Sequence, residues 1–288
     1  MPHLILIHIG PTYPTYMNDC IQQLQEVSSI DIHVLVPRAH HDAVVVGVTV
    51  CALEDIPETT EISMFNSLSR HSTAFRNGFW KFTTMRFFYL HAYTQWKGLH
   101  DIFHIEYDNL IYEDFLPALP IFREKEMWGV MDHPNRCIPS FLYFRDTGIQ
   151  ADLLQCLLQL APLAQNDMQS LAIFMKSHPD RVGWLPIVVN YTGGEIDPRY
   201  SAHATRFGCL FDGAWLGQYV GGVDPRNTPG DTRGFINETC VVRCDRADFH
   251  MSARQKPTLN DLPVVNLHIH SKDLKRWRLL KEDTADGR

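Results

Sequence analysis

The first forty residues of the chain constrain its fold most strongly, because they read as a strand, a helix and a second strand in close succession. Residues 4–9 form the apolar run LILIHI, which stops at a Gly-Pro pair, and residues 31–36 form a similar run that stops at a proline. Between them, residues 16–27 carry apolar side chains at the three- and four-residue steps of an amphipathic helix. Two apolar strands joined by a crossover helix pair in parallel within a covered sheet. The sequence therefore predicts an α/β protein with a mostly parallel central sheet and flanking helices.

The rest of the chain continues this alternation. We expect strands within 44–53 and at 101–105, 128–131, 141–144 and 264–270, helices at 81–97, 151–163 and 167–176, and loops around short helices from 193 to 234. No repeat, low-complexity tract or clear linker interrupts the pattern. We therefore predict one domain over residues 1–288, with a first half at 1–115, an elaborated second half at 116–277 and a tail at 278–288.

Charge, hydropathy and cysteine usage exclude several classes of function. The chain has 26 basic and 33 acidic residues, and this net charge of −7 argues against broad nucleic-acid binding, which needs a basic face. Its apolar runs are far shorter than the roughly 20 residues of a membrane span, so we expect no span. The seven cysteines are scattered, with Cys240 and Cys244 as the one close pair. We therefore expect free thiols and a cytoplasmic location.

An acid-x-acid triplet is the first candidate for chemistry. Glu106 and Asp108 directly follow the strand expected at 101–105, and residues two apart in extended chain point the same way. Both carboxylates then project from the carboxyl end of a strand, where open α/β sheets bind ligands. Hard oxygen ligands suit Mg²⁺ or Mn²⁺, which can hold a diphosphate. A solvated strand end is the alternative interpretation of the triplet.

A second candidate lies on the last expected strand. Asn266, His268 and His270 alternate onto one face of that strand, and Ser271 and Lys272 follow. One imidazole could complete the metal site, and Lys272 could pair with a phosphate. Two buried, hydrogen-bonded histidines, or the paired histidines of a metal hydrolase, are the alternatives.

At these two motifs, the sequence resembles nucleotide-sugar-dependent glycosyltransferases of the GT-A fold. The resemblance is to small enzymes of bacteria and large DNA viruses, including chlorella-virus enzymes that build capsid glycans, one of them a xylosyltransferase. It covers about residues 3–277. The matching elements are the N-terminal strand and turn, the helix with Trp80, Lys81 and Arg86, the segment FHIEYD at 103–108, the segment FDGAWLGQY at 211–219 and the segment NLHIHSK at 266–272. The chain departs from the usual DxD motif in having Glu106 at the first acidic position.

The resemblance implies a role for each matching position. Asp108 should bind Mn²⁺ (or Mg²⁺) directly, and Glu106 should reach the metal through water or contact the ribose. His270 or His268 should supply the C-terminal metal ligand, and we favour His270 because it is nearer Lys272, which should hold the diphosphate. The nucleotide base should lie against His8, Gly10 and Pro11, and Arg86 should meet the sugar or a phosphate. These roles would make the first half the nucleotide-sugar-binding half and the second half the acceptor side.

An inverting transferase also needs a carboxylate that accepts the proton of the acceptor hydroxyl. We expect Asp212 in this role, because it follows an apolar run on the segment where the resemblance places the base. A cap for the helix that follows is the alternative role, and Asp146, Asp167 and Asp224 are other candidates for the base. Aromatic side chains that could stack on sugars are Tyr143, Trp184, Trp215 and Tyr219.

The leading hypothesis is thus a metal-dependent enzyme that moves a sugar from a nucleoside-diphosphate sugar to a glycan or glycoprotein hydroxyl, with inversion. A UDP-sugar is favoured as the donor, with UDP-xylose as one candidate. If the chain is viral, it would act in the host-cell cytoplasm. The alternatives are a metal-dependent phosphohydrolase acting on a nucleotide or sugar phosphate, and a sugar-binding module without metal-dependent nucleotide binding.

Overall fold

A computed structural model describes residues 1–189, 197–234, 249–251 and 256–279 of the chain. The helices are α1 (Tyr16–Val27), α2 (Thr60–Leu68), α3 (Phe79–Lys97), α4 (Leu119–Phe122), α5 (Thr147–Leu160), α6 (Asp167–Ser177), α7 (Ala204–Phe207), α8 (Trp215–Gly221) and α9 (Leu274–Trp277). Short 3₁₀ turns include η1 (Arg38–Ala43) and η3 (Phe75–Asn77).

The strands form one large sheet and two small ones. The large sheet has the order β3-β2-β1-β4-β7-β6-β8. Its members are β1 (His3–Ile7), β2 (Asp31–Val36), β3 (Thr49–Ala52), β4 (Ile102–His104), β6 (Met127–His133), β7 (Arg136–Phe144) and β8 (Val182–Trp184). Strand β7 runs antiparallel to both of its neighbours, and the other pairs are parallel. The small sheets pair β5 (Asn109–Ile111) with β12 (Asn266–His268), and β10 (Thr258–Leu259) with β9 (Phe249–His250) and β11 (Leu262–Pro263).

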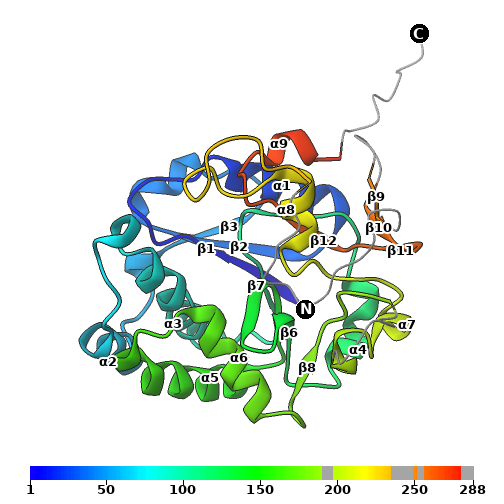
Figure 1. Cartoon of the computed structure of the whole chain (residues 1–288). Coiled ribbons are helices and arrows are strands. Elements are labelled where there is room, and N and C mark those ends of the chain that lie inside the picture. The colour runs from blue at the N-terminus through cyan, green and yellow to red at the C-terminus, as the bar shows by residue number, and fades with distance from the viewer. Residues whose placement is uncertain (190–196, 235–248, 252–255, 280–288) are drawn as a thin grey trace.

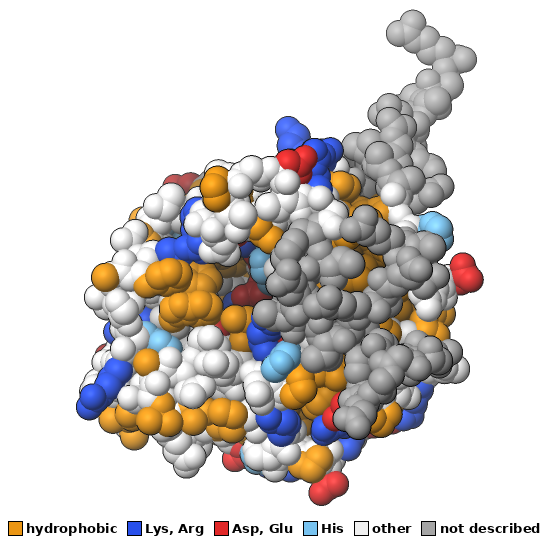
Figure 2. Space-filling model, viewed as in Figure 1, with side chains coloured by type: hydrophobic (Ala, Val, Ile, Leu, Met, Phe, Trp, Pro, Cys, Tyr) orange, Lys and Arg blue, Asp and Glu red, His pale blue; other side chains and the backbone are white. Residues whose placement is uncertain are grey.

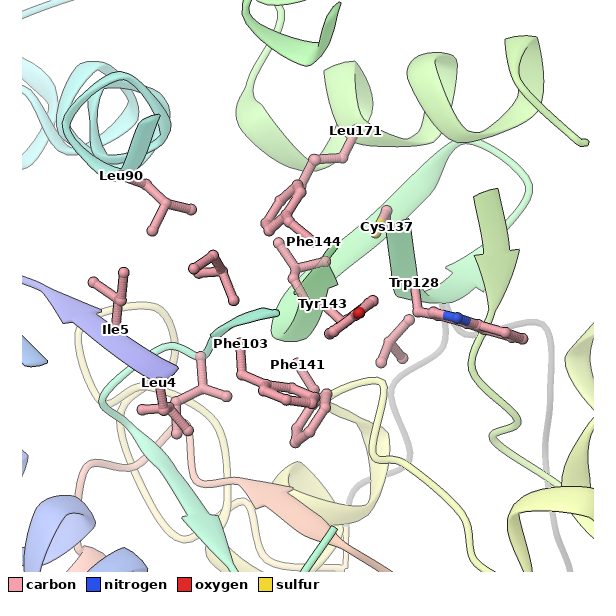
Figure 3. Packing of buried hydrophobic residues seen from close by; sticks show 14 of the residues in the cluster. Leu4, Ile5, Leu90, Phe103, Trp128, Cys137, Phe141, Tyr143, Phe144 and Leu171 are labelled. Atoms are coloured by element: carbon pink, nitrogen blue, oxygen red, sulfur yellow. The ribbon is translucent and has the colours of Figure 1, made fainter. Parts of the chain in front are cut away.

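Helices cover both faces of the large sheet (Figure 1). One layer contains the helices α2, α3, α5 and α6, which contact one another and the strands β1 and β7. On the opposite side of the sheet, α1 contacts both β5 and α9. The core between these layers is strongly apolar, and Leu4, Ile5, Phe103 and Trp128 are 0–1% exposed. Figure 3 shows Leu90 of α3 and Ile5 of β1 facing each other across this interface, with the aromatic side chains of β4 and β7 beside them. The predicted α/β architecture with a mostly parallel, helix-flanked sheet is confirmed.

Most of the predicted elements are present, some with different ends. The expected helix at 16–27 and strand at 31–36 have the predicted bounds. In the region 44–53, only Thr49–Ala52 pairs as a strand, and Val46 is 91% exposed. The expected strand 264–270 forms a ladder over Asn266–His268, whereas Val264 makes an isolated bridge with Leu210. The ladder ends before a turn in which the Lys272 N–H donates to the Ile269 carbonyl. No helix within the described residues is long and apolar enough to cross a bilayer.

The β5–β12 ladder matters most for the rest of the molecule, because it joins the middle of the chain to its last quarter. Residue Asn109 pairs with His268, and the Ile269 N–H donates to the Asp108 carbonyl. Helix α8 packs on β12 so closely that Gly217 can have no side chain. A Cβ there would lie 2.1 Å from the His268 carbonyl oxygen.

We predict that Gly217→Ala lowers the free energy of unfolding by about 1–3 kcal/mol, the usual cost of forcing atoms into a packed interface. Chemical denaturation monitored by circular dichroism measures the change. The control is Gly221→Ala on the same helix, where the new Cβ would meet movable side-chain atoms at 3.2 Å. Equal stability of the two variants would contradict the packing argument.

Candidate active site

A cavity of about 800 Å³ opens at the carboxyl ends of β1 and β4. Its walls come from the turn after β1, from η3 and the start of α3, from the segment after β4 and from the segment after β12. Figure 2 shows a hollow on one face, with acidic and histidine side chains at its floor and basic and apolar side chains around its rim. A cavity of this size is typical of small-molecule sites, and its position matches the ligand side of open α/β sheets.

The floor of the cavity carries a cluster of Glu106, Asp108 and His268. The Nε2 atom of His268 lies 3.0 Å from Asp108 Oδ1 and 3.4 Å from Glu106 Oε2. Asp108 is 7% exposed and His268 is 5% exposed. The segment after β4 therefore turns both carboxylates toward β12, as the acid-x-acid spacing predicts.

Opposite charges hold this cluster together. Burial alone would raise the pKa of Asp108, but His268 and Lys272 hold it well below its ordinary value. The Lys272 ammonium forms an ion pair with Asp108 Oδ2. Burial alone would lower the pKa of His268, whereas the Asp108 carboxylate raises it. Lys272 and His268 thus offset the charge of the buried Asp108 carboxylate.

The donor set of this cluster fits a divalent cation. One ligand atom from each of Glu106, Asp108 and His268 lies within 4.8 Å of the other two. Two carboxylates and one imidazole are ligands that Mn²⁺ accepts and Mg²⁺ tolerates. The Nδ1 atom of His268 is buried without a partner within the described residues, so the ring is positioned mainly through Nε2.

The two late histidines have different surroundings, and it is His268, not the preferred His270, that lies against the carboxylates. Their rings lie 4.3 Å apart between centroids, but His268 is the one that contacts both carboxylates. His270 Nδ1 instead lies 3.2 Å from Gln218 Nε2, and burial lowers the pKa of His270 well below its ordinary value. The strand alternation could not separate the two because the chain turns immediately after Ile269.

Arg86 of α3 bridges Glu106 of the carboxylate–histidine cluster and Asp167. The sequence pattern did not indicate that Asp167 would be its partner. Its guanidinium donates to Glu106 over 2.7 Å and to Asp167 over 2.6 Å. Burial would lower the pKa of Arg86, but the two carboxylates raise it, so the arginine stays charged. Asp167 lies at the start of α6, and burial raises its pKa despite the arginine. Both Arg86 and Asp167 line the cavity.

The expected base-binding residues all line the same cavity. His8, Gly10 and Pro11 form the turn after β1, and the His8 Nδ1 atom lies 3.0 Å from the Tyr107 hydroxyl. Burial lowers the pKa of His8 to about 4, so the ring is neutral at pH 7. Tyr107, between the two acids of the triplet, contributes to this wall.

Two further groups of residues line the cavity. One is the aromatic wall of Phe75 and Trp80, whose rings are stacked with centroids 6.1 Å apart. The other is Asp224, which is ion-paired with Arg76 and Arg226. The irregular composition of these segments gave no periodic signal for an element of secondary structure. The Pro-Arg-Asn sequence after Asp224 is typical of a turn, but it does not indicate the arginine partners of Asp224.

The aromatic residues expected to stack on sugars lie elsewhere. Tyr143, Trp184 and Trp215 are 0–4% exposed. The ring of Tyr219 packs against Phe249. The Tyr143 hydroxyl donates to Asp101. None of the four lines the cavity.

The structure also corrects the expected role of Asp212. This residue is 0% exposed and does not line the cavity. Its carboxylate accepts the backbone N–H groups of Leu216, Gly217 and His268 over 2.9–3.0 Å. Asp212 therefore caps α8 and holds that helix to β12. Among the other base candidates, Asp167 and Asp224 line the cavity, and Asp146 caps α5.

Comparison with known proteins gives solved structures only. No family model and no curated protein matches the chain. Mouse xyloside xylosyltransferase 1, in its apo form, aligns with a TM-score of 0.47 and 9% identity over 64% of this chain and 85% of that chain. The galactosyltransferase LgtC, in complex with donor and acceptor sugar analogues, aligns with a TM-score of 0.42 and 10% identity over 64% and 73%. An active-site mutant of LgtC aligns with a TM-score of 0.45 and 12% identity over 69% and 81%.

We predict that Asp212→Asn lowers the free energy of unfolding by about 2–3 kcal/mol, because the amide NH₂ would face backbone N–H donors in a buried site. The matched control is Asp146→Asn, whose carboxylate caps α5 at an exposed position and whose replacement is itself a good cap. Urea denaturation measures both. Wild-type stability of Asp212→Asn would rule out the capping role.

Proposed function

We propose that this chain is a divalent-metal-dependent glycosyltransferase that takes a sugar from a nucleoside-diphosphate sugar and transfers it to a glycan hydroxyl. The observation that carries the proposal is the cluster of Glu106, Asp108 and His268 with Lys272 beside it, at the floor of a cavity large enough for such a donor. A site for a diphosphate needs a cation between acidic ligands and the phosphate oxygens, and a second positive charge on the far side.

Glu106, Asp108 and His268 would hold the cation, with Mn²⁺ as our first choice. When bound, the ion neutralises the negative charge that develops on the diphosphate as it leaves. The Lys272 ammonium pairs with Asp108. This ion pair supports the proposal that the ammonium moves onto a phosphate when the donor enters. Its backbone has a φ of 65°, a left-handed conformation that is uncommon outside glycine and often found at functional positions.

The remaining cavity residues give the donor an orientation. The turn with His8, Gly10 and Pro11 supports a base-binding role, and we propose uridine as the base and xylose as one candidate sugar. Arg86 is held by Glu106 and Asp167, so its guanidinium is fixed at the metal cluster, where the sugar and the diphosphate would meet. The stacked rings of Phe75 and Trp80 offer an apolar surface to an acceptor glycan.

The inverting course expected from the sequence depended on Asp212. With that carboxylate closed off, inversion needs another proton acceptor, and Asp167 and Asp224 are the cavity carboxylates outside the metal cluster. Both are ion-paired with arginines, so either would have to leave its partner before it could act as a base. Proton NMR of the anomeric centre in the first product distinguishes inversion from retention.

A metal-dependent phosphohydrolase remains the second candidate, because the same cluster could hold a phosphate and a metal-bound water. The aromatic wall beside the cluster favours transfer, since it gives an organic acceptor a place to bind. Release of nucleoside diphosphate in the presence and absence of a glycan acceptor separates the two. A transferase is stimulated by the acceptor, and a hydrolase is not.

We predict that Asp108→Asn reduces transfer by about a thousandfold or more, equivalent to roughly 4 kcal/mol in the activation barrier. The variant should also lose Mn²⁺-dependent binding of UDP in a calorimetric titration while keeping its circular dichroism spectrum. Glu113→Gln is the control, because its carboxylate lies after β5 and pairs with the exposed Lys256. Full activity of the Asp108 variant, or full wild-type activity in excess chelator, would refute the proposal.

We predict that Lys272→Met weakens donor binding by about 10- to 100-fold, the value of one charge-assisted hydrogen bond to a phosphate. The change should appear mainly in the KM for the donor. Methionine removes the ammonium, keeps most of the length of the unbranched side chain and places no new demand on the left-handed backbone. Lys275→Met on α9 is the control, because Lys275 is basic, nearby and exposed. Equal donor affinities of the two variants would remove Lys272 from the site.

A further inference from the structure

A second cluster of metal-ligand side chains lies at the opposite end of β1 from the cavity. It consists of His3 at the start of β1 and of Asp31 and His33 on β2. In the parallel ladder, His3 pairs with Asp31 and Ile5 pairs with His33, so all three side chains lie on the same face of the sheet. His8, which lines the cavity, follows β1 five residues after His3, which corresponds to roughly 17 Å of strand. The two clusters are therefore separate sites.

Three atoms of this cluster form a nearly equilateral triangle. His3 Nδ1 lies 3.1 Å from Asp31 Oδ2 and 3.1 Å from His33 Nε2, and His33 Nε2 lies 3.0 Å from Asp31 Oδ2. The His33 Nδ1 atom lies 2.8 Å from the hydroxyl of Tyr93 on α3. The side chains of His3 and His33 are 14% and 8% exposed, whereas Asp31 is 40% exposed.

The three contacts of this triangle cannot all be hydrogen bonds at the same time. The Asp31 carboxylate is an acceptor, so both ring nitrogens must carry a hydrogen if each is to bond to it. Two N–H groups would then face each other across 3.1 Å with no acceptor between them. If either nitrogen gives up its hydrogen, its lone pair faces the carboxylate oxygen instead. A cation that accepts all three lone pairs removes this conflict.

The distances also fit a tetrahedral ion. Four ligands about 2.0–2.1 Å from zinc lie about 3.3–3.4 Å from one another at tetrahedral angles. The three observed separations of 3.0–3.1 Å are slightly shorter, so only a small outward rotation of the side chains is needed. Two imidazoles and one carboxylate are ligands that zinc and neighbouring transition metals prefer, in contrast to Mg²⁺ or Ca²⁺.

The surroundings of the triangle fix one ligand and leave an opening. A neutral His33 that donates its Nδ1 hydrogen to the Tyr93 oxygen presents the Nε2 lone pair to the centre of the triangle. Tyr93 is 1% exposed, so its contact with His33 is shielded from water. The half-exposed Asp31 marks the side from which an ion and a fourth ligand, water, can enter.

We propose that His3, Asp31 and His33 form a binding site for a transition-metal cation, with Zn²⁺ as the preferred ion. The ligand atoms are His3 Nδ1, Asp31 Oδ2 and His33 Nε2, and water completes the tetrahedron. An ion bound there joins the starts of two neighbouring parallel strands. The site is independent of the metal cluster in the cavity and of the proposed glycosyl transfer.

The test uses the full chain after chelator treatment, with Co²⁺ as a spectroscopic probe and Zn²⁺ as a competitor. We expect one equivalent of Co²⁺ to give the intense visible absorption of a tetrahedral site and one equivalent of Zn²⁺ to remove it. His3→Gln and Asp31→Asn should abolish the band. Tyr93→Phe should weaken Co²⁺ binding about tenfold, as is usual when the hydrogen-bond partner of a metal-binding histidine is lost.

Two matched controls separate this site from its neighbours. His100→Gln changes a histidine at the same end of the sheet that is bonded to Asp101 and lies outside the triangle. Asp108→Asn disables the cavity cluster. Both variants should keep the tetrahedral band. Loss of the band in Asp108→Asn, its persistence in both His3→Gln and Asp31→Asn, or its absence from the wild type would overturn the proposal.

A measurement on the wild type guards against misfolded variants. Long-range ¹H–¹⁵N spectra of the histidine rings report which nitrogen binds Zn²⁺. We expect His3 to bind through Nδ1 and His33 through Nε2 after one equivalent has been added. Unchanged resonances of both rings would refute the site even if every variant failed to fold.

Discussion

A buried carboxylate must be neutralised, and in this protein Asp108 is the carboxylate around which the candidate active site is arranged. Its negative charge is balanced by His268 and by Lys272, and both contacts depend on the last quarter of the chain returning to the segment after β4. Removing an ion from water is costly unless close partners compensate. A divalent cation held by these carboxylates would supply positive charge of the kind that His268 and Lys272 contribute here.

The rest of the fold serves to hold these charges in place. The β5–β12 ladder aligns Asn109 with His268, and Asp212 fixes the end of that ladder to α8 by accepting three backbone N–H groups. Gly217 permits the close approach of α8. Asn109, Asp212 and Gly217 do not line the cavity, but they determine where the imidazole of His268 lies. The arrangement is a rigid support for a polar site, which is what precise metal and phosphate binding requires.

Much of this could be predicted from the sequence, and the failures have definite physical causes. The apolar runs at 4–9 and 31–36 and the helical spacing between them identify the parallel sheet because burial on both faces leaves a strong pattern. The acid-x-acid spacing brought Glu106 and Asp108 together correctly. The pairing of Arg86 with Asp167 joins residues far apart in sequence, and no local pattern records such a contact.

Two residues show where sequence reasoning reaches its limit. Asp212 has the surroundings expected of either a base or a cap, and only its full burial decides between them. His268 and His270 alternate identically in extended chain, and only the turn after Ile269 separates them. Similarly, His3 and Asp31-x-His33 look unrelated until the register of β1 and β2 places them side by side.

The antiparallel pairing of β12 with β5 has a consequence for how the protein matures during synthesis. The central strands β1 to β4 can assemble once the first half of the chain has left the ribosome, yet a nascent chain that stops short of residue 268 has neither the imidazole nor the ammonium that neutralise Asp108. The ladder that brings these partners to Asp108 therefore closes only after most of the chain has been made.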